Sequence, residues 1–173
     1  MRCICSGAEI IRDEGLCRVP IRGFMGFILS FDPGATTGCT IAEHVHGTEF
    51  QVFQSLEYTW QDRFQIFNLI YTNRMSIKAI VIERYRLFAD PTTLRSQIGS
   101  EIPSARVIGI VELSAKVCKL DCIHFQDPNQ RLQVGVLPEH KKLIKRSRHC
   151  IDSYLHLRYF ILTIARKERT DGE

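Results

Sequence analysis

Apolar and polar residues follow one another along this chain in runs that predict strands first and helices later. Runs bounded by turn residues, over about 27–32, 38–44 and 49–55, predict a meander of three antiparallel strands. The unbroken apolar run over about 78–83 is typical of a central strand that is covered on both faces. A shorter run over about 120–125 predicts a fifth strand.

Apolar spacings of three and four residues predict three helices, over about 60–76, 93–118 and 147–165. Pro103 should bend or restart the second helix, and Ser147 should cap the third. We expect the first helix to bury a stripe made of Trp60, Phe64, Phe67, Ile70 and Tyr71. The order of elements predicts an α/β fold with a mixed five-stranded sheet, three antiparallel strands followed by parallel ones, and helices on both faces.

Length and composition are those of an ordinary globular domain. The chain has 173 residues, of which 45% are hydrophobic and 24% charged. Residues 1–26 show no clean period and predict a flexible N-terminal extension, 27–166 form the expected domain, and 167–173 a C-terminal tail. No apolar stretch reaches the ~18 residues of a transmembrane helix, and no secretory leader opens the chain, so we expect a cytoplasmic protein.

The seven cysteines do not form the even framework of a small disulfide-rich domain, and their spacings lack the partners of a structural zinc site. We therefore expect reduced thiols.

Positive charge is concentrated near the C-terminus. The net charge is +4, but residues 141–169 hold nine Lys or Arg and two acids, a net charge of +7, so the other residues sum to −3. Such a polarised chain suits a phosphate-binding face around the last helix. A solvated helix flank is the alternative explanation.

Three acidic residues lie at the ends of predicted elements. Asp32 ends the first strand before a Pro-Gly turn, Glu83 ends the fourth strand, and Asp152 follows His149 by three residues at the start of the last helix. Because ligands lie beyond the carboxyl ends of parallel strands in such sheets, Asp32 and Glu83 are candidates for one site. Carboxylates on rigid elements can hold divalent metal ions for phosphodiester chemistry.

Each of these residues also has a structural explanation. Asp32 is a good turn former, Glu83 can pair with Arg84 or Arg86, and Asp152 favours the positive end of the helix dipole. His149 can be a local cap or a surface residue. Their joint order along the chain favours a functional site.

The motifs Ile28-Leu-Ser-Phe-Asp32-Pro-Gly, Ile80-Val-Ile-Glu83 and His149-x-x-Asp152 together resemble the RuvC-type Holliday junction resolvases of the ribonuclease H-like superfamily. Bacteriophage and prophage versions look most similar, and the resemblance covers about 27–165. It implies a metal-dependent endodeoxyribonuclease that cleaves branched DNA, with two Mg²⁺ or Mn²⁺ ions held by Asp32, Glu83 and Asp152. His149 would be a further ligand, a proton relay or a group that positions water.

The resemblance also implies how DNA and a second subunit bind. An aromatic residue just past the second acid, here Tyr85 or Phe88, would stack on bases at the junction centre, although burial in the core is the alternative. The family forms homodimers largely through the long helix, here 94–118, although that helix face could also be ordinary core. Phosphate contacts would come from Arg84, Arg86, Arg95, Lys141, Lys142, Lys145, Arg146 and Arg148.

One departure from the family bears on the substrate. Cellular RuvC proteins carry a Gly- and Lys-rich segment before the last helix, and here the short stretch 126–134 leads quickly to His140-Lys-Lys. Flaps or forks are therefore open as substrates beside four-way junctions.

Two other classes of function are rivals. Asp32-Pro-Gly-Ala-Thr-Thr-Gly resembles the first phosphate loop of sugar kinases and actin-like ATPases, but those proteins need two lobes, and the stretch lacks the Gly-Lys-[Ser/Thr] of a P-loop. A DNA-architecture protein without catalytic activity would bind branched DNA and leave it uncut.

Overall fold

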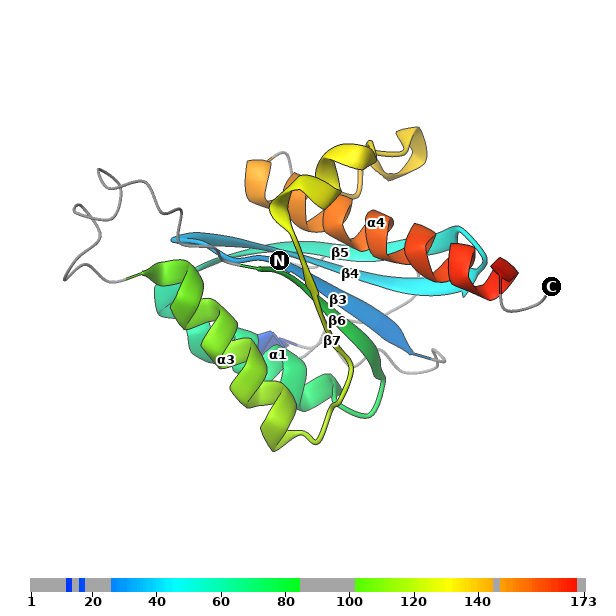
Figure 1. Ribbon diagram of the computed structural model, residues 1–173. Coiled ribbons are helices and arrows are strands. Elements are labelled where there is room, and N and C mark those ends of the chain that lie inside the picture. The colour runs from blue at the N-terminus through cyan, green and yellow to red at the C-terminus, as the bar shows by residue number, and fades with distance from the viewer. Residues whose placement is uncertain (1–11, 14–15, 18–25, 85–101, 145–146, 171–173) are drawn as a thin grey trace, which may run out of the picture.

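The structure is a computed structural model, and it describes residues 12–13, 16–17, 26–84, 102–144 and 147–170 (Figure 1). The predicted residues Tyr85, Arg86, Phe88, Arg95, Lys145 and Arg146 lie outside the described part, as does most of the predicted extension 1–26. A two-stranded ribbon pairs β1 (Arg12–Asp13) with β2 (Leu16–Cys17). The main sheet consists of β3 (Phe27–Asp32), β4 (Thr36–His46), β5 (Glu49–Thr59), β6 (Ile77–Glu83) and β7 (Ile123–Gln126).

The sheet confirms the predicted topology. Its strand order is β5-β4-β3-β6-β7, with β3, β4 and β5 antiparallel and β6 and β7 parallel to β3. The central strand β3 keeps the predicted bounds, and all six of its residues are buried. The carboxyl ends of β3 and β6 therefore lie side by side, as the sequence predicted.

Helices cover both faces of the sheet. α1 (Arg63–Asn73), which follows a short 3₁₀ helix η1 (Trp60–Asp62), packs with α3 (Pro103–Val117) on one face, and α4 (Arg148–Thr170) lies on the other (Figure 1). Pro103 occupies the first turn of α3, where a missing N–H is harmless. Ser147 caps α4, because its hydroxyl accepts a hydrogen bond from the Cys150 N–H at 3.2 Å.

The alternation of side chains along β3 separates two apolar cores. Phe27, Leu29 and Phe31 pack toward α1 and α3, whereas Ile28 belongs to the core beneath α4. By the same period of two, Asp32 faces α4. Two further 3₁₀ helices, η2 (Pro128–Gln133) and η3 (Pro138–His140), connect β7 to α4.

The predicted buried stripe of α1 was wrong in part. The helix buries Ile66, Leu69, Ile70 and Asn73, whereas Phe64 is 69% and Tyr71 45% exposed. The guanidinium of Arg63 lies over the Phe64 ring, and that of Arg74 over the Tyr71 ring. Each of these exposed rings thus makes a cation–π contact at the surface and does not pack in the core.

Two further findings concern the described residues alone. No helix among them is long and apolar enough to cross a membrane. Cys39, Cys118, Cys122 and Cys150 are free thiols in the structure.

Candidate active site

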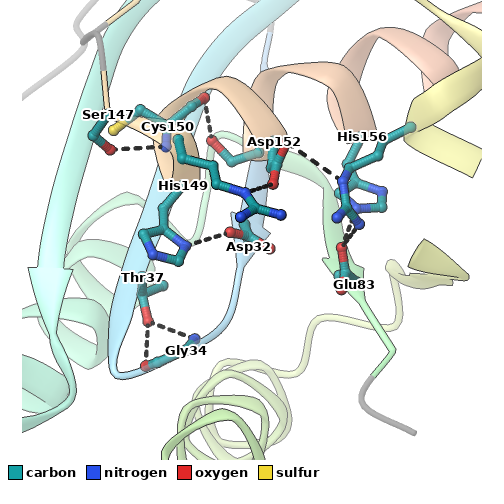
Figure 2. A network of polar contacts seen from close by, with 12 residues as sticks. Asp32, Gly34, Thr37, Glu83, Ser147, His149, Cys150, Asp152 and His156 are labelled. Atoms are coloured by element: carbon teal, nitrogen blue, oxygen red, sulfur yellow. Dashed lines mark hydrogen bonds and ion pairs between the residues drawn. The ribbon is translucent and has the colours of Figure 1, made fainter. Parts of the chain in front are cut away.

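The three predicted acids come together on the α4 face of the sheet. Asp32 ends β3, Glu83 ends the parallel neighbour β6, and Asp152 lies in the second turn of α4 (Figure 2). Arg131 contacts both Glu83 and Asp152, and the charges of these two acids add to the effect of burial in raising the pKa of Asp32. The sequence-predicted set therefore converges from three separate elements.

One face of α4 supplies the helical side of the site. His149, Asp152 and His156 follow one another at intervals of three and four residues, so they lie along one stripe of the helix (Figure 2). Ser153, next to Asp152, contacts the strand below, with its hydroxyl 2.8 Å from that of Thr40 on β4. This buried hydrogen bond fixes how α4 is rotated over the sheet.

Asp32 is bound by His149. The His149 Nδ1 lies 2.8 Å from the Asp32 Oδ2, and the aspartate is buried while the histidine side chain is 39% exposed. Burial raises the pKa of Asp32 above its ordinary value; the hydrogen bond from His149 opposes this effect, and the two neighbouring acids reinforce it. His149, predicted as a site residue of open role, thus contacts Asp32 in the structure.

Glu83 has two partners on the same carboxylate oxygen. The Arg131 Nη1 lies 2.5 Å from its Oε2, and the His156 Nε2 lies 2.7 Å from it. The His156 ring is fully buried, and its Nδ1 lies 2.8 Å from the Gln126 Oε1. Gln126 stands opposite Glu83 in the pairing of β6 with β7, so the histidine bridges two neighbouring strand ends.

Asp152 lies between two arginines. The Arg131 Nε is 3.4 Å from its Oδ1, and the Arg148 Nε is 3.8 Å from its Oδ2. The Arg148 side chain is 83% exposed, whereas that of Arg131 is 16% exposed. Arg131 is thus the less exposed of the two arginines, and it joins Asp152 to Glu83.

The position of Arg131 is set by η2. Pro128 begins this 3₁₀ helix, and the Gln130 side chain accepts a hydrogen bond from the Asp127 N–H at 2.8 Å, as in a capping box. The Arg131 Nη1 also donates to the Pro128 carbonyl at 3.0 Å. A short, capped element therefore directs the guanidinium toward the acids.

Glycines allow the helix to approach this closely. A Cβ on Gly38 of β4 would lie 2.0 Å from the His149 carbonyl oxygen and 2.6 Å from the Cys150 nitrogen. The first turn of α4 therefore rests directly on the backbone of β4. In the preceding turn, the Thr37 hydroxyl lies 3.3 Å from both the N–H and the carbonyl of Gly34, close to the His149 ring (Figure 2).

The donor chemistry of the site fits a hard divalent cation. Three carboxylates from β3, β6 and α4 supply oxygen ligands, which Mg²⁺ and Mn²⁺ prefer. In the described conformation, however, no three His, Cys, Asp or Glu side chains of the described residues are arranged to hold an ion. The Arg131 guanidinium contacts two of the three acids, Glu83 and Asp152.

The described basic candidates are exposed at the surface. Lys141, Lys142 and Arg148 are exposed just before and within the first turn of α4, and Arg84 follows Glu83 directly. The Arg84 guanidinium lies over the Phe125 ring, 5.9 Å from its centre.

Sequence reasoning missed Arg131 and His156. The spacing of His156 from His149 and Asp152 is the signal that places it on the same helical stripe. Arg131 lies 48 residues from Glu83, and nothing local in the sequence joins them.

Comparisons with known proteins place the fold. No protein-family model matches the sequence, and no curated protein matches it. T. thermophilus RuvC in complex with a Holliday junction substrate matches with a TM-score of 0.60 at 10% identity, over 82% of this chain and 96% of that one. The fowlpox virus Holliday junction resolvase matches in two structures.

In one of them the TM-score is 0.48 at 11% identity, over 83% of this chain and 99% of that one. In the other, a complex with substrate Holliday junction DNA, it is 0.44 at 12% identity, over 83% and 98%. The fold conclusion rests on the match to T. thermophilus RuvC, with its TM-score of 0.60, and on the strand order of the sheet. The chain therefore has the ribonuclease H-like fold of RuvC, which its motifs predicted.

Proposed function

We propose that this protein is a metal-dependent, structure-specific endonuclease that cleaves branched DNA, Holliday junctions above all. The observation that supports it is the convergence of Asp32, Glu83 and Asp152 at the carboxyl ends of two central parallel strands. The sheet carrying them has the fold of T. thermophilus RuvC, a protein whose structure contains a Holliday junction substrate. A fold alone does not assign an activity, so the acids carry the proposal.

The three carboxylates would hold one or two Mg²⁺ or Mn²⁺ ions. When bound, such ions activate water for in-line attack on the phosphodiester and stabilise the leaving oxygen. The neighbouring side chains orient the ligands: His149 holds Asp32 at 2.8 Å, and His156 holds Glu83 at 2.7 Å. Such hydrogen bonds to ligating carboxylates restrict their rotation and so favour one binding geometry.

DNA would approach over the exposed cations around the first turn of α4. Lys141, Lys142 and Arg148 would contact phosphates and set affinity without choosing a sequence. Tyr85, Phe88, Arg86, Arg95, Lys145 and Arg146 remain predicted DNA contacts. We propose that the protein prefers four-way junctions to flaps and forks, and the cleavage assay described below compares these substrates.

A homodimer is the proposed assembly. Leu113 and Val117 lie one turn apart on α3, and both are about half exposed. A second copy of this helix could cover them, as the predicted dimer helix requires. Light scattering over a range of protein concentrations measures the oligomeric state.

Cleavage of synthetic DNA tests the activity. The purified chain with Mg²⁺ or Mn²⁺ should nick a four-way junction faster than a flap, a fork or a linear duplex, and a chelator should stop the reaction. Asp32→Asn should reduce cleavage by about a hundredfold or more, the order that is lost with a group that stabilises transition-state charge. Its junction affinity should be unchanged.

Asp121→Asn is the matched control, because Asp121 is an exposed aspartate before β7. It should cleave like the wild type. Undiminished cleavage by Asp32→Asn would remove Asp32 from the site. Tight junction binding by the wild type without any metal-dependent cleavage would favour the non-catalytic DNA-binding alternative.

A further inference from the structure

The guanidinium of Arg131 lies inside the cluster of acids. Its Nη1 is 2.5 Å from the Glu83 Oε2, its Nε is 3.4 Å from the Asp152 Oδ1, and its side chain is 16% exposed. Glu83 and Asp152 are similarly covered, with side chains 18% and 15% exposed. This is a partly buried, charge-assisted contact and not one of the fully solvated ion pairs that contribute little.

The contact is also built into the fold. The Pro128 carbonyl accepts a hydrogen bond from the same Nη1 at 3.0 Å, and Pro128 and Gln130 stabilise the short helix that carries the arginine. Arg148, the other arginine on Asp152, has none of these features: its Nε is 3.8 Å from the carboxylate, and its side chain is 83% exposed. Arg131 is therefore held in place, whereas Arg148 is solvated.

Electrostatics explain why a cation is held here. Asp32, Glu83 and Asp152 bring three carboxylates together with side chains only 10–18% exposed, so water screens their mutual repulsion poorly. Arg131 supplies a positive charge between two of the three acids. Its guanidinium neutralises part of the negative charge that a bound metal ion would otherwise neutralise.

Arg131 occupies one oxygen of each of two carboxylates that a divalent ion would use, the Glu83 Oε2 and the Asp152 Oδ1. Mg²⁺ approaches carboxylate oxygens to about 2.0–2.1 Å, closer than the guanidinium nitrogen at the Glu83 Oε2. The two cations would also repel each other at that range. A metal ion held by these two oxygens would therefore compete with the described position of Arg131.

We infer that Arg131 is a resident cation of the acidic cluster, and that a divalent metal ion binds there only by displacing its guanidinium from Glu83 and Asp152. The inference rests on the proposed metal-dependent function. The exchange lowers the affinity of the free protein for metal, and it keeps the acids paired when no metal is bound. Arg131 acts here through the ligands, as a positioning residue.

The test is Mn²⁺ binding in the absence of DNA, measured by isothermal titration calorimetry on the full chain. Arg131→Gln should bind Mn²⁺ about tenfold more tightly than the wild type, because a hydrogen bond to a charged group contributes free energy of that order. Arg148→Gln is the matched control, which removes the solvated arginine from the same aspartate. Its affinity should stay within about twofold of the wild type, as expected for an exposed pair.

A second measurement uses the wild-type chain, in case Arg131→Gln folds poorly. In NMR spectra of arginine side chains, Mg²⁺ should shift the Nε–H resonance of Arg131, which is assigned by its loss in Arg131→Lys. An unmoved resonance at saturating Mg²⁺ would overturn the inference, as would equal Mn²⁺ affinities of the wild type and Arg131→Gln. Neither result would affect the proposed nuclease. If no form of the protein binds Mn²⁺, both proposals fail.

Discussion

Gly38 tests how closely α4 must approach the sheet to form the site. An alanine Cβ at this position would lie 2.0 Å from the His149 carbonyl oxygen, 2.2 Å from its carbon and 2.6 Å from the Cys150 nitrogen. Real Cβ contacts do not fall below 3.0 Å, so Gly38→Ala must open this gap by about 1 Å. Every obstructing atom is backbone, so no side-chain rotation relieves the clash.

The strand cannot move away to make room. Gly38 pairs with Asp32 of β3 on one side and with Glu57 of β5 on the other. The first turn of α4 must therefore lift, which stretches the 2.8 Å hydrogen bond between His149 and Asp32. Overpacking of this kind costs about 1–3 kcal/mol, and a weakened hydrogen bond to a charged group adds about 1 kcal/mol.

We expect Gly38→Ala to lower the free energy of unfolding by about 2–4 kcal/mol, measured by urea denaturation of the metal-free protein. For a chain of this length that corresponds to a fall in Tm of roughly 4–16 °C. Gly109→Ala is the control, because Gly109 lies within α3 and a Cβ there meets nothing within 4 Å. It should stabilise the protein by up to about 1 kcal/mol through helix propensity.

A change of less than about 0.5 kcal/mol in Gly38→Ala, the range of an ordinary surface substitution, would refute the reasoning. It would mean that α4 does not rest on β4 at this point. The arrangement of His149 over Asp32 would then lose its structural basis.

Two further predictions concern pH and salt. Burial and the nearby Arg158 lower the pKa of His140 below its ordinary 6.5, while Glu139 opposes them. The unfolded chain therefore binds the proton more readily, so stability should fall as pH drops through about 6.5, and His140→Gln should weaken this fall in urea denaturation at several pH values. An identical pH dependence of the two proteins would contradict it. The second prediction concerns the slope of log K against log salt concentration for junction binding. The double variant Lys141→Ala, Lys142→Ala should reduce this slope by about 2, because each phosphate contact contributes about 0.9. Lys116→Ala on α3 is the control and should leave the slope unchanged. An unaltered slope in the double variant would mean that Lys141 and Lys142 do not contact DNA phosphates.

Local patterns were sufficient for most of the fold. The apolar run at 27–32 matches β3 residue for residue, and Ser147 caps α4 as its type predicts. The bounds of β4, β5 and α4 extend beyond the predicted ones, because pairing and packing continue a strand or helix past its clearest pattern. The buried face of α1 was the main failure, since aromatic residues spaced for a core stripe lie under arginines at the surface.

The amino-acid sequence by itself determined which carboxylates end the central strands and begin the last helix. Acids after buried runs are a local signal, and the parallel pairing of β3 with β6 brings two of them to one edge. Only the tertiary structure decided what surrounds them: Arg131 between Glu83 and Asp152, and His156 beneath Glu83. These partners lie 48 and 73 residues from Glu83 in the sequence, and their contacts exist because α4 and η2 pack against the same strand ends. Long-range contacts of this kind follow from packing geometry, which no local pattern of residues records.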